Sequence, residues 1–216
     1  MKIAIIAGSR EAEQLQTKLA KATLIDGEDL PDSFDADCVI DASHPCEPET
    51  PEHVAALCAA QDLPYLRLRR NAWEPLAEDA WLSVADAAEA AHILQRDWRR
   101  VFLCLGEADR APFTDDDSRW YLVRTSQRNA ASMPPNYALT DKEGPFLVEQ
   151  EINLMRHHKI DVLVTRNAGG KGAVPKVSAA RAIGLPVVML ARPDAPGPEV
   201  ATIRKAMAWL GTLARR

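Results

Sequence analysis

The chain has 216 residues, of which 47% are hydrophobic and 26% are charged, as is typical of a globular protein with a substantial buried core. Its formal net charge of −5 argues against a general nucleic-acid-binding protein. The sequence has no run of about 20 apolar residues, so we expect neither a membrane-spanning helix nor a membrane partner.

The cysteines indicate the redox state of the protein's surroundings. Cys38, Cys46, Cys58 and Cys104 show no CxxC spacing. Free thiols and a cytoplasmic location are therefore expected, and we predict no metal site.

The first half of the chain predicts alternating strands and helices. Apolar runs predict strands over residues 3–7, 23–25, 37–41, 65–68 and 81–84. Helical spacing predicts helices over residues 11–21, 52–60 and 86–98. For the second helix we expect Thr50 as N-cap and Pro51 in the first turn. We place a domain boundary near residues 98–100, which gives an N-terminal domain of residues 1–98 and a C-terminal domain of residues 99–216.

The second half continues this alternation. Strands are predicted over residues 101–105, 120–124, 137–139, 161–165 and 187–190. Helices are predicted over residues 147–158, 176–183 and 199–213.

One stretch organises the second half, Asp161-Val-Leu-Val-Thr-Arg-Asn-Ala-Gly-Gly170. A short apolar strand leads into a polar loop whose two glycines permit a positive φ and the close approach of a ligand. The earlier stretch from Asp37 to Pro45 has the same order, and both are followed by an Ala-rich helix, Leu-Pro and a strand. The pattern predicts an α/β fold with two Rossmann-like, doubly wound parallel-sheet domains and an interdomain cleft. Chance similarity is the alternative to common ancestry of the halves.

The first strand ends in a candidate phosphate-binding loop. The G-x-G-x-x-G fingerprint is absent, but Gly8, Ser9 and Arg10 stand at a helix start, where backbone N–H groups bind phosphate. Asp26 lies 18 residues after Gly8, near the place where NAD-dependent enzymes hold the ribose hydroxyl. A surface turn is an equally good reading of Asp26.

Other strand ends carry candidates for binding an anionic substrate. Ser43 and His44 follow one strand, and strand alternation puts Arg67 and Arg69 on one face of another. Arg124 ends a third strand. Arginine binds carboxylates through a rigid fork, so we expect these side chains to face a ligand. Solvated charge, and a structural role for an isolated histidine, are the alternatives.

Taken in order, these loops resemble the precorrin-6A reductase family of cobalamin (corrin-ring) biosynthesis. The matching residues are Asp41-Ala-Ser-His-Pro45, Leu63-Pro-Tyr-Leu-Arg-Leu-Arg-Arg70 with Trp73, Tyr121-Leu-Val-Arg124, Gly144-Pro-Phe146, the stretch from Asp161 to Gly170, and Lys176 with Ala179-Ala180-Arg181. The chain departs from the family at Ala7-Gly8-Ser9, where members usually have a Gly-Gly-Thr-like turn, and at Cys46, where Phe is common.

The resemblance implies NADPH-dependent reduction of one double bond of the tetrapyrrole precorrin-6A, giving precorrin-6B. The cofactor-binding candidates are then Gly8, Ser9, Arg10, Thr165, Arg166, Asn167, Gly169, Gly170 and Lys176. The substrate-binding candidates are Ser43, His44, Arg67, Arg69 and Arg124. His44 is also the candidate catalytic proton donor, with bound water as the alternative.

Several readings stay open at this point. The substrate of the resemblance is either metal-free precorrin-6A or the cobalt-loaded ring of the anaerobic route. Asp26 hints at NADH, whereas the family implies NADPH. Two rival functions are an α/β reductase for another anionic metabolite and an NADP(H)-binding regulatory protein without catalysis.

Overall fold

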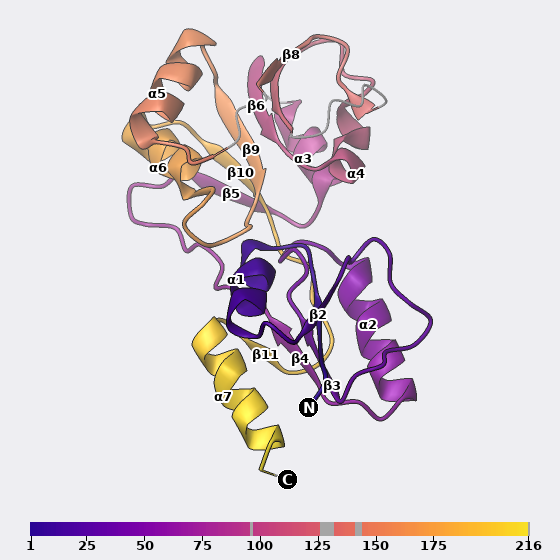
Figure 1. Ribbon diagram of the computed structural model, residues 1–216. Coiled ribbons are helices and arrows are strands. Elements are labelled where there is room, and N and C mark those ends of the chain that lie inside the picture. The colour runs from indigo at the N-terminus through magenta and orange to yellow at the C-terminus, as the bar shows by residue number, and fades with distance from the viewer. Residues whose placement is uncertain (96, 126–131, 141–143, 216) are drawn as a thin grey trace. The chain divides into compact units, whose positions relative to one another are not determined.

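The computed structural model describes residues 1–95, 97–125, 132–140 and 144–215. The chain forms two compact units, one of Met1–Asn71 with Pro193–Arg216 and one of Ala72–Arg192 (Figure 1). This division differs from the predicted boundary near residue 98. The chain crosses into the second unit at Ala72 because Trp81–Val84 (β5) pairs in parallel with Val187–Leu190 (β10). It returns at Pro193 because Glu199–Val200 (β11) pairs with Tyr65–Leu68 (β4).

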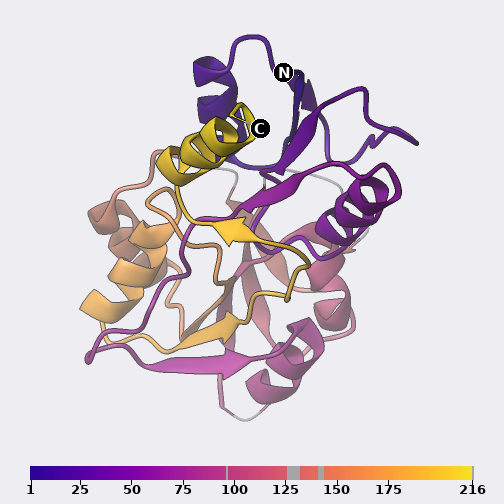
Figure 2. The same ribbon diagram turned by 90° about the horizontal axis from the view of Figure 1, so that it is seen from below.

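The first unit is built on a five-stranded sheet in the order β11-β4-β3-β1-β2, in which every pair is parallel. Its other elements are β1 (Ile3–Ile6), α1 (Arg10–Lys18), β2 (Thr23–Ile25), β3 (Cys38–Asp41), α2 (Glu49–Ala60) and α7 (Ile203–Leu213). The strand order reverses direction between β1 and β3, which makes their exit loops the switch point of this sheet. Figure 2 shows the yellow β11 beside the purple β4.

Strand alternation divides the core of the first unit into two layers. Leu15 of α1 and Leu210 of α7 pack on one face of the sheet, together with Ile5 and Ile40. Val54 of α2 packs on the other face, among Val39 and its neighbours. In Figure 1 the two helices α1 and α7 accordingly lie on one side of the sheet and α2 on the other.

The second unit is built on a six-stranded parallel sheet in the order β5-β10-β9-β6-β7-β8. Its other elements are α3 (Ala87–Leu94), β6 (Arg100–Cys104), α4 (Glu107–Arg110), the 3₁₀ helix η1 (Ala111–Phe113), β7 (Trp120–Arg124), β8 (Tyr137–Thr140), α5 (Val148–His157), β9 (Val162–Arg166) and α6 (Val174–Ala182). Helices α5 and α6 cover one face, and α3 with η1 covers the other (Figure 1). The strand order reverses between β6 and β9, which makes their exit loops the switch point of this sheet.

The predicted α/β class with two doubly wound parallel sheets is confirmed, while several element ends differ. The predicted helix over 199–213 begins only at Ile203, because Arg67 and Arg69 donate backbone N–H groups to Pro198 O and Val200 O and so draw β11 into the sheet. Thr50 is not the N-cap of α2, which starts at Glu49. Helix α3 ends at Leu94 instead of residue 98. The short helices α4 and η1 were not predicted.

Within the described part of the chain, no helix is long and apolar enough to cross a membrane.

Candidate functional site

The exit loops of β1 and β3 touch at the switch point of the first unit. Gly8 has φ 137°, and a Cβ atom there would lie 2.9 Å from His44 N and 3.0 Å from Ser43 Cα. Only glycine allows this approach. The Ser9 hydroxyl donates to Ala42 O at 2.6 Å. The structure therefore brings Gly8 and Ser9 together with Ser43 and His44, a contact that the sequence did not predict.

The backbone N–H groups at the start of α1 donate no hydrogen bond to the side chain of the N-cap residue, Ser9. Ser9 is the N-cap residue, but its hydroxyl bonds to Ala42 instead of the helix. Arg10 is exposed at the first helical position. Unpaired N–H groups at a helix start attract anions in general, and phosphate binding at Gly8, Ser9 and Arg10 stays a prediction.

His44 is exposed, and one ring nitrogen is engaged by its own loop. The Cys46 backbone N–H donates to His44 Nδ1 at 3.3 Å. An accepting nitrogen carries no proton, so in the neutral ring the proton resides on Nε2. The neutral side chain can therefore donate a hydrogen bond through Nε2, whereas proton transfer to a substrate requires the imidazolium form, in which Nδ1 also carries a proton and no longer accepts from Cys46.

Beneath this loop lies a buried charged network rather than an open arginine clamp. Arg67 is 1% exposed, and its Nε lies 3.7 Å from Asp41 Oδ2. The Tyr65 hydroxyl donates to the same oxygen at 3.0 Å, and the Ser43 N–H donates to Asp41 Oδ1 at 2.9 Å. Strand alternation turns Arg67 toward the sheet face that α2 covers, where it supports the Ser43 loop through Asp41. Direct contact of Arg67 with a substrate stays a prediction.

Burial controls the ionisation of this network. It lowers the pKa of Arg67, and the Asp41 carboxylate opposes the shift. The pKa of Tyr65 rises through burial and then through the charge and hydrogen bond of Asp41. The Arg67 Nη1 and Nη2 atoms and the Ser43 hydroxyl are buried without a hydrogen-bond partner among the described residues. Such groups are costly, so they often mark a place where a ligand or water completes the network.

Arg69 also serves the scaffold of its unit. Its Nη2 donates to Pro193 O at 2.8 Å, and its Nη1 lies 3.6 Å from the Glu199 carboxylate. Arg69 thus fastens the returning C-terminal segment to β4, a role that the sequence pattern did not reveal.

In the second unit, the exit loop of β9 is tied down by its own side chains. Asn167 Oδ1 accepts from Trp73 N at 2.8 Å, and its Nδ2 donates to Trp73 O at 2.9 Å. The Trp73 indole N–H donates to Gly170 O at 2.7 Å. Gly169 and Gly170 have φ of 68° and 71°, the left-handed conformation expected from the glycine pair.

An ion pair spans the switch point of the second sheet. Arg166, at the end of β9, pairs with Asp109 of α4, which follows β6. The sequence reading missed Asp109 because α4 was not predicted. The ion pair links the loops that follow β6 and β9, and the Asp109 carboxylate neutralises the charge of Arg166.

The other candidates of this unit lie on the sheet face covered by α5 and α6. Thr165 is 1% exposed, and Lys176 of α6 is 8% exposed, with Nζ 5.6 Å from the centre of the Trp73 ring. The Cys104 thiol lies near them, and burial raises its pKa to about 11. The thiol is therefore protonated and unreactive at neutral pH.

Arg124 is not an unpaired carboxylate clamp. Its Nη1 and Nη2 donate to the two oxygens of Glu151 at 2.9 and 3.0 Å, and its guanidinium lies 4.3 Å from the centre of the Phe146 ring and 4.8 Å from that of Phe102. The sequence contains a sign that Glu151 faces the interior. It lies four residues before Met155 and therefore on the same face of α5, and these two are the buried residues of the helix.

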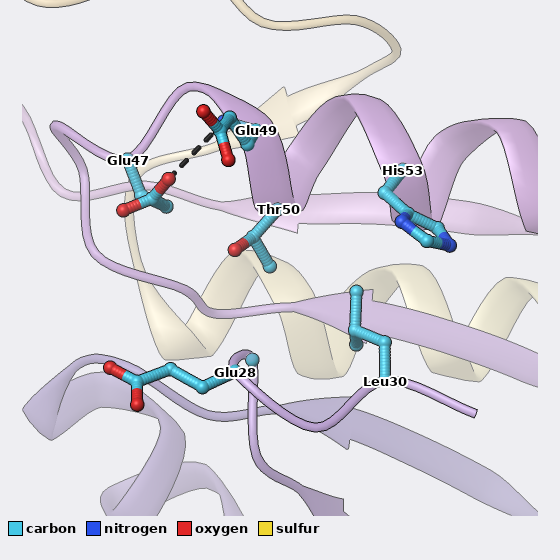
Figure 3. A pocket seen from close by; sticks show the side chains of 7 residues that line it. Glu28, Leu30, Glu47, Glu49, Thr50 and His53 are labelled. Atoms are coloured by element: carbon cyan, nitrogen blue, oxygen red, sulfur yellow. Dashed lines mark hydrogen bonds between the residues drawn. The ribbon is translucent and has the colours of Figure 1, made fainter.

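A hollow that the sequence reading missed lies in the first unit, after β2 and beside the start of α2. Its volume is about 450 Å³, and Figure 3 shows its lining side chains. The lining residues are Gly27, Glu28, Leu30, Glu47, Glu49, Thr50 and His53. Asp26, the residue singled out by spacing, accepts the Glu28 N–H at 3.1 Å and so closes its own turn.

Comparison with known proteins decides the family. Residues 28–211 match the family model described as "Precorrin-6x reductase CbiJ/CobK". The chain belongs to the precorrin-6x reductase family. Membership makes it a reductase that needs a hydride donor. The matched region begins after Gly8, so the β1 exit loop lies outside it.

Individual relatives agree with this assignment. A precorrin-6A reductase of Rhodococcus erythropolis is 39% identical over 183 residues, which cover 83% of this chain and 73% of the relative. One of Rhodobacter capsulatus is 34% identical over 174 residues, covering 80% and 69%. A solved structure of CobK precorrin-6A reductase matches with a TM-score of 0.89 at 29% identity, covering 98% of this chain and 97% of that one. The resemblance read from the sequence is thus confirmed.

Proposed function

We propose that the chain reduces precorrin-6A to precorrin-6B in cobalamin biosynthesis, with NADPH as the hydride donor. The identity of 39% to a protein named precorrin-6A reductase, over most of both chains, supports this proposal most directly. Hydride transfer is the chemistry of the nicotinamide, so the protein's task is to bind and orient two ligands and to exclude water.

Each unit has candidate cofactor contacts at its own switch-point loop. Gly8, Ser9 and Arg10 offer uncapped helix N–H groups and a cation for phosphate. Thr165, Arg166, Asn167, Gly169, Gly170 and Lys176 are the candidates in the second unit. Because Asn167 and Arg166 have partners within their own unit, we propose that they shape the loop. We propose that the backbone at Gly169 and Gly170 makes the closest approach to the ligand.

The proposed substrate contacts are Ser43, His44, Arg69 and Arg124, with Arg67 as a positioning residue. Precorrin-6A carries several carboxylates, which arginine side chains recognise. Arg124 keeps one N–H, on Nε, without a hydrogen-bond partner among the described residues. The reduction adds a hydride and a proton, and we propose that the proton comes from His44 Nε2 or from bound water.

The metal-free ring is the preferred substrate of this proposal, because both relatives described above carry the name precorrin-6A reductase. The cobalt-loaded ring is the alternative. No nucleic-acid or membrane partner is proposed. The four free thiols support a reducing compartment such as the cytoplasm.

An anaerobic assay of NADPH oxidation tests the proposal. Precorrin-6A is supplied to the purified chain, with cobalt-precorrin-6A and a simple anionic enone in parallel reactions. We expect turnover with precorrin-6A that exceeds the other two. Faster turnover with the cobalt ring would select the anaerobic alternative. Turnover only with the enone would indicate another anionic metabolite, and binding of NADP⁺ without any turnover would indicate a regulatory protein.

The same assay identifies the proton source. His44→Ala retains appreciable turnover if bound water supplies the proton, and it loses turnover almost completely if His44 is the general acid. Unchanged binding of NADP⁺ by the variant controls for a folding defect.

A further inference from the structure

The returning C-terminal segment, residues 193–200, packs against the side chain of Tyr65. Gly197 in this segment has φ 83°, and a Cβ atom on it would lie 2.7 Å from Tyr65 Cε1 and 2.8 Å from Tyr65 Cδ1. Both distances are too short for a carbon–carbon contact, so only glycine lets the segment pass this close to the ring. The backbone of the segment is itself held in the sheet, because Arg67 N donates to Pro198 O at 2.9 Å. The segment therefore limits where the Tyr65 ring can lie.

The hydroxyl of Tyr65 bonds to the buried carboxylate beneath the β3 exit loop. Tyr65 lies opposite Val39 in the register of β3 and β4, and its hydroxyl donates to Asp41 Oδ2 at 3.0 Å, two residues further along the same face of β3. Burial raises the pKa of Tyr65, and the charge and hydrogen bond of Asp41 raise it further. The hydroxyl therefore stays protonated and remains a donor at neutral pH.

Asp41 connects Tyr65 to the loop that carries the candidate substrate contacts. Its Oδ1 accepts the Ser43 N–H at 2.9 Å. The next residue of the loop is His44, the candidate proton donor. A continuous set of contacts thus leads from Gly197, through Tyr65 and Asp41, to the β3 exit loop.

We infer that Tyr65 is a positioning residue for the reduction and that Gly197 of the returning segment holds its ring in place. Tyr65 fixes the Asp41 carboxylate, which fixes the backbone at Ser43 and with it the place of His44. The inference rests on the proposed function, because it takes the β3 exit loop as part of the substrate site. It gives a C-terminal segment, far from β3 along the chain, a role in shaping that site.

The first test removes the hydroxyl and keeps the ring. Tyr65→Phe should lower kcat for precorrin-6A roughly tenfold at saturating concentrations of both ligands, because a displaced loop misplaces the groups that act on the substrate. Tyr121→Phe is the matched control, since the Tyr121 hydroxyl likewise donates to a carboxylate, that of Asp116, at 2.5 Å in the other unit. Both variants should lose stability, and only Tyr65→Phe should lose kcat.

The second test needs no substrate. Hydrogen exchange at the Ser43 amide, whose acceptor is the Asp41 carboxylate, should be roughly tenfold faster in Tyr65→Phe than in the wild type. Tyr121→Phe should leave the exchange at Ser43 unchanged.

The third test displaces the same ring from the side of the returning segment. Gly197→Ala should lower kcat by a similar factor, because the added Cβ pushes Tyr65 away from Asp41. Gly184→Ala adds the same left-handed strain at φ 67° but meets no atom within 4 Å, so it should keep the wild-type kcat.

A double variant asks whether Gly197 acts through Tyr65. If it does, Tyr65→Phe combined with Gly197→Ala should have a kcat within about twofold of either single variant. Independent effects would multiply to a loss of roughly a hundredfold.

The outcomes separate this inference from the proposed function. A wild-type kcat in Tyr65→Phe, a multiplied loss in the double variant, or unchanged exchange at Ser43 would overturn the inference while the reductase activity stands. Failure of the wild type to reduce precorrin-6A would overturn the proposed function. Exchange at Ser43 in the Tyr65 and Gly197 variants would then still decide whether these two residues hold the β3 exit loop.

Discussion

The exit loops of β3 and β9 follow short buried strands in similar sequence settings, yet they satisfy their polar groups in different ways. In the second unit, Asn167 and Arg166 find partners at Trp73 and Asp109. In the first unit, the loop rests on the buried Asp41–Arg67 pair, and the Ser43 hydroxyl has no partner among the described residues. A similar strand-and-loop pattern thus produced one loop whose polar side chains have partners and one with a buried hydroxyl that has no hydrogen-bond partner among the described residues.

The comparison predicts different responses to mutation. Changes beneath the β3 loop should cost much stability because they expose a buried charge. Changes in the β9 loop should cost less and act through loop geometry. Three substitutions at these loops test this contrast, and a fourth in a remote network serves for comparison; they follow from the largest expected effect to the smallest.

The largest effect is expected for Asp41→Asn. The substitution leaves the Arg67 guanidinium buried without its counter-charge, which should reduce the free energy of unfolding by about 3–5 kcal/mol. Urea unfolding measures the loss. Adding Arg67→Met should restore more than half of it, because the unpaired charge is then gone. A double variant as unstable as Asp41→Asn would refute the explanation.

The exposed pair of Lys2 and Asp35 is the matched control for that experiment. Its side chains are 67% and 90% exposed. Asp35→Asn should leave the midpoint of urea unfolding nearly unchanged, because solvent screens such a pair.

Asn167→Ala comes next. It removes two hydrogen bonds to the Trp73 backbone and should reduce the free energy of unfolding by about 1–3 kcal/mol. Hydrogen exchange at the Trp73 amide should accelerate, since that N–H loses its acceptor. Asn136→Ala, which loses one exposed bond to Asp117 O, is the control and should change stability by about 0.5 kcal/mol or less. Unchanged exchange at Trp73 would contradict the proposed bracing of the loop.

The hydrogen-bond network around Asp116 lies outside both loops and provides a comparison, because its contribution to stability depends on pH. Burial alone would raise the pKa of Asp116, but hydrogen bonds from Ser118, Tyr121 and Arg119 lower it to about 2. Because the pKa is below its unfolded value, the carboxylate contributes stability above pH ~4, and this is lost as the pH falls toward ~2.

The effect is modest because solvent screens the partly exposed carboxylate, and we expect roughly 1–2 kcal/mol. Urea unfolding of the wild type and Asp116→Asn between these pH values measures it: the variant should lack this part of the acid destabilisation. Identical pH profiles would count against the network, and cofactor affinity should not change.

The smallest loss of stability is expected for Gly170→Ala. A left-handed conformation costs a non-glycine residue about 1–2 kcal/mol. Gly184→Ala is the matched control, with φ 67° and no atom within 4 Å of an added Cβ. The two variants should lose similar stability, but only Gly170→Ala should weaken NADP⁺ binding in a titration. Equal affinities would remove the β9 loop from the cofactor site.

The sequence by itself determined the α/β class, the parallel sheets, most strand positions and the family, because apolar runs and loop motifs are local features that survive without knowledge of packing. It also located both exit loops, since glycines and polar residues directly follow the strands. The single contiguous boundary predicted near residue 98 differs from the division of the structure, because β5 and β11 join sheets through partners that are far away in the chain.

Only the tertiary structure decided what each charged side chain does. Arg67, Arg124 and Arg166 look alike as arginines at strand ends, yet each meets a carboxylate at a different sequence distance, Asp41, Glu151 or Asp109. The hollow at Glu28 likewise depends on α2 lying beside the turn after β2. Charged side chains pair with the groups that lie close to them in space, and the order of residues along the chain does not reveal which groups these are.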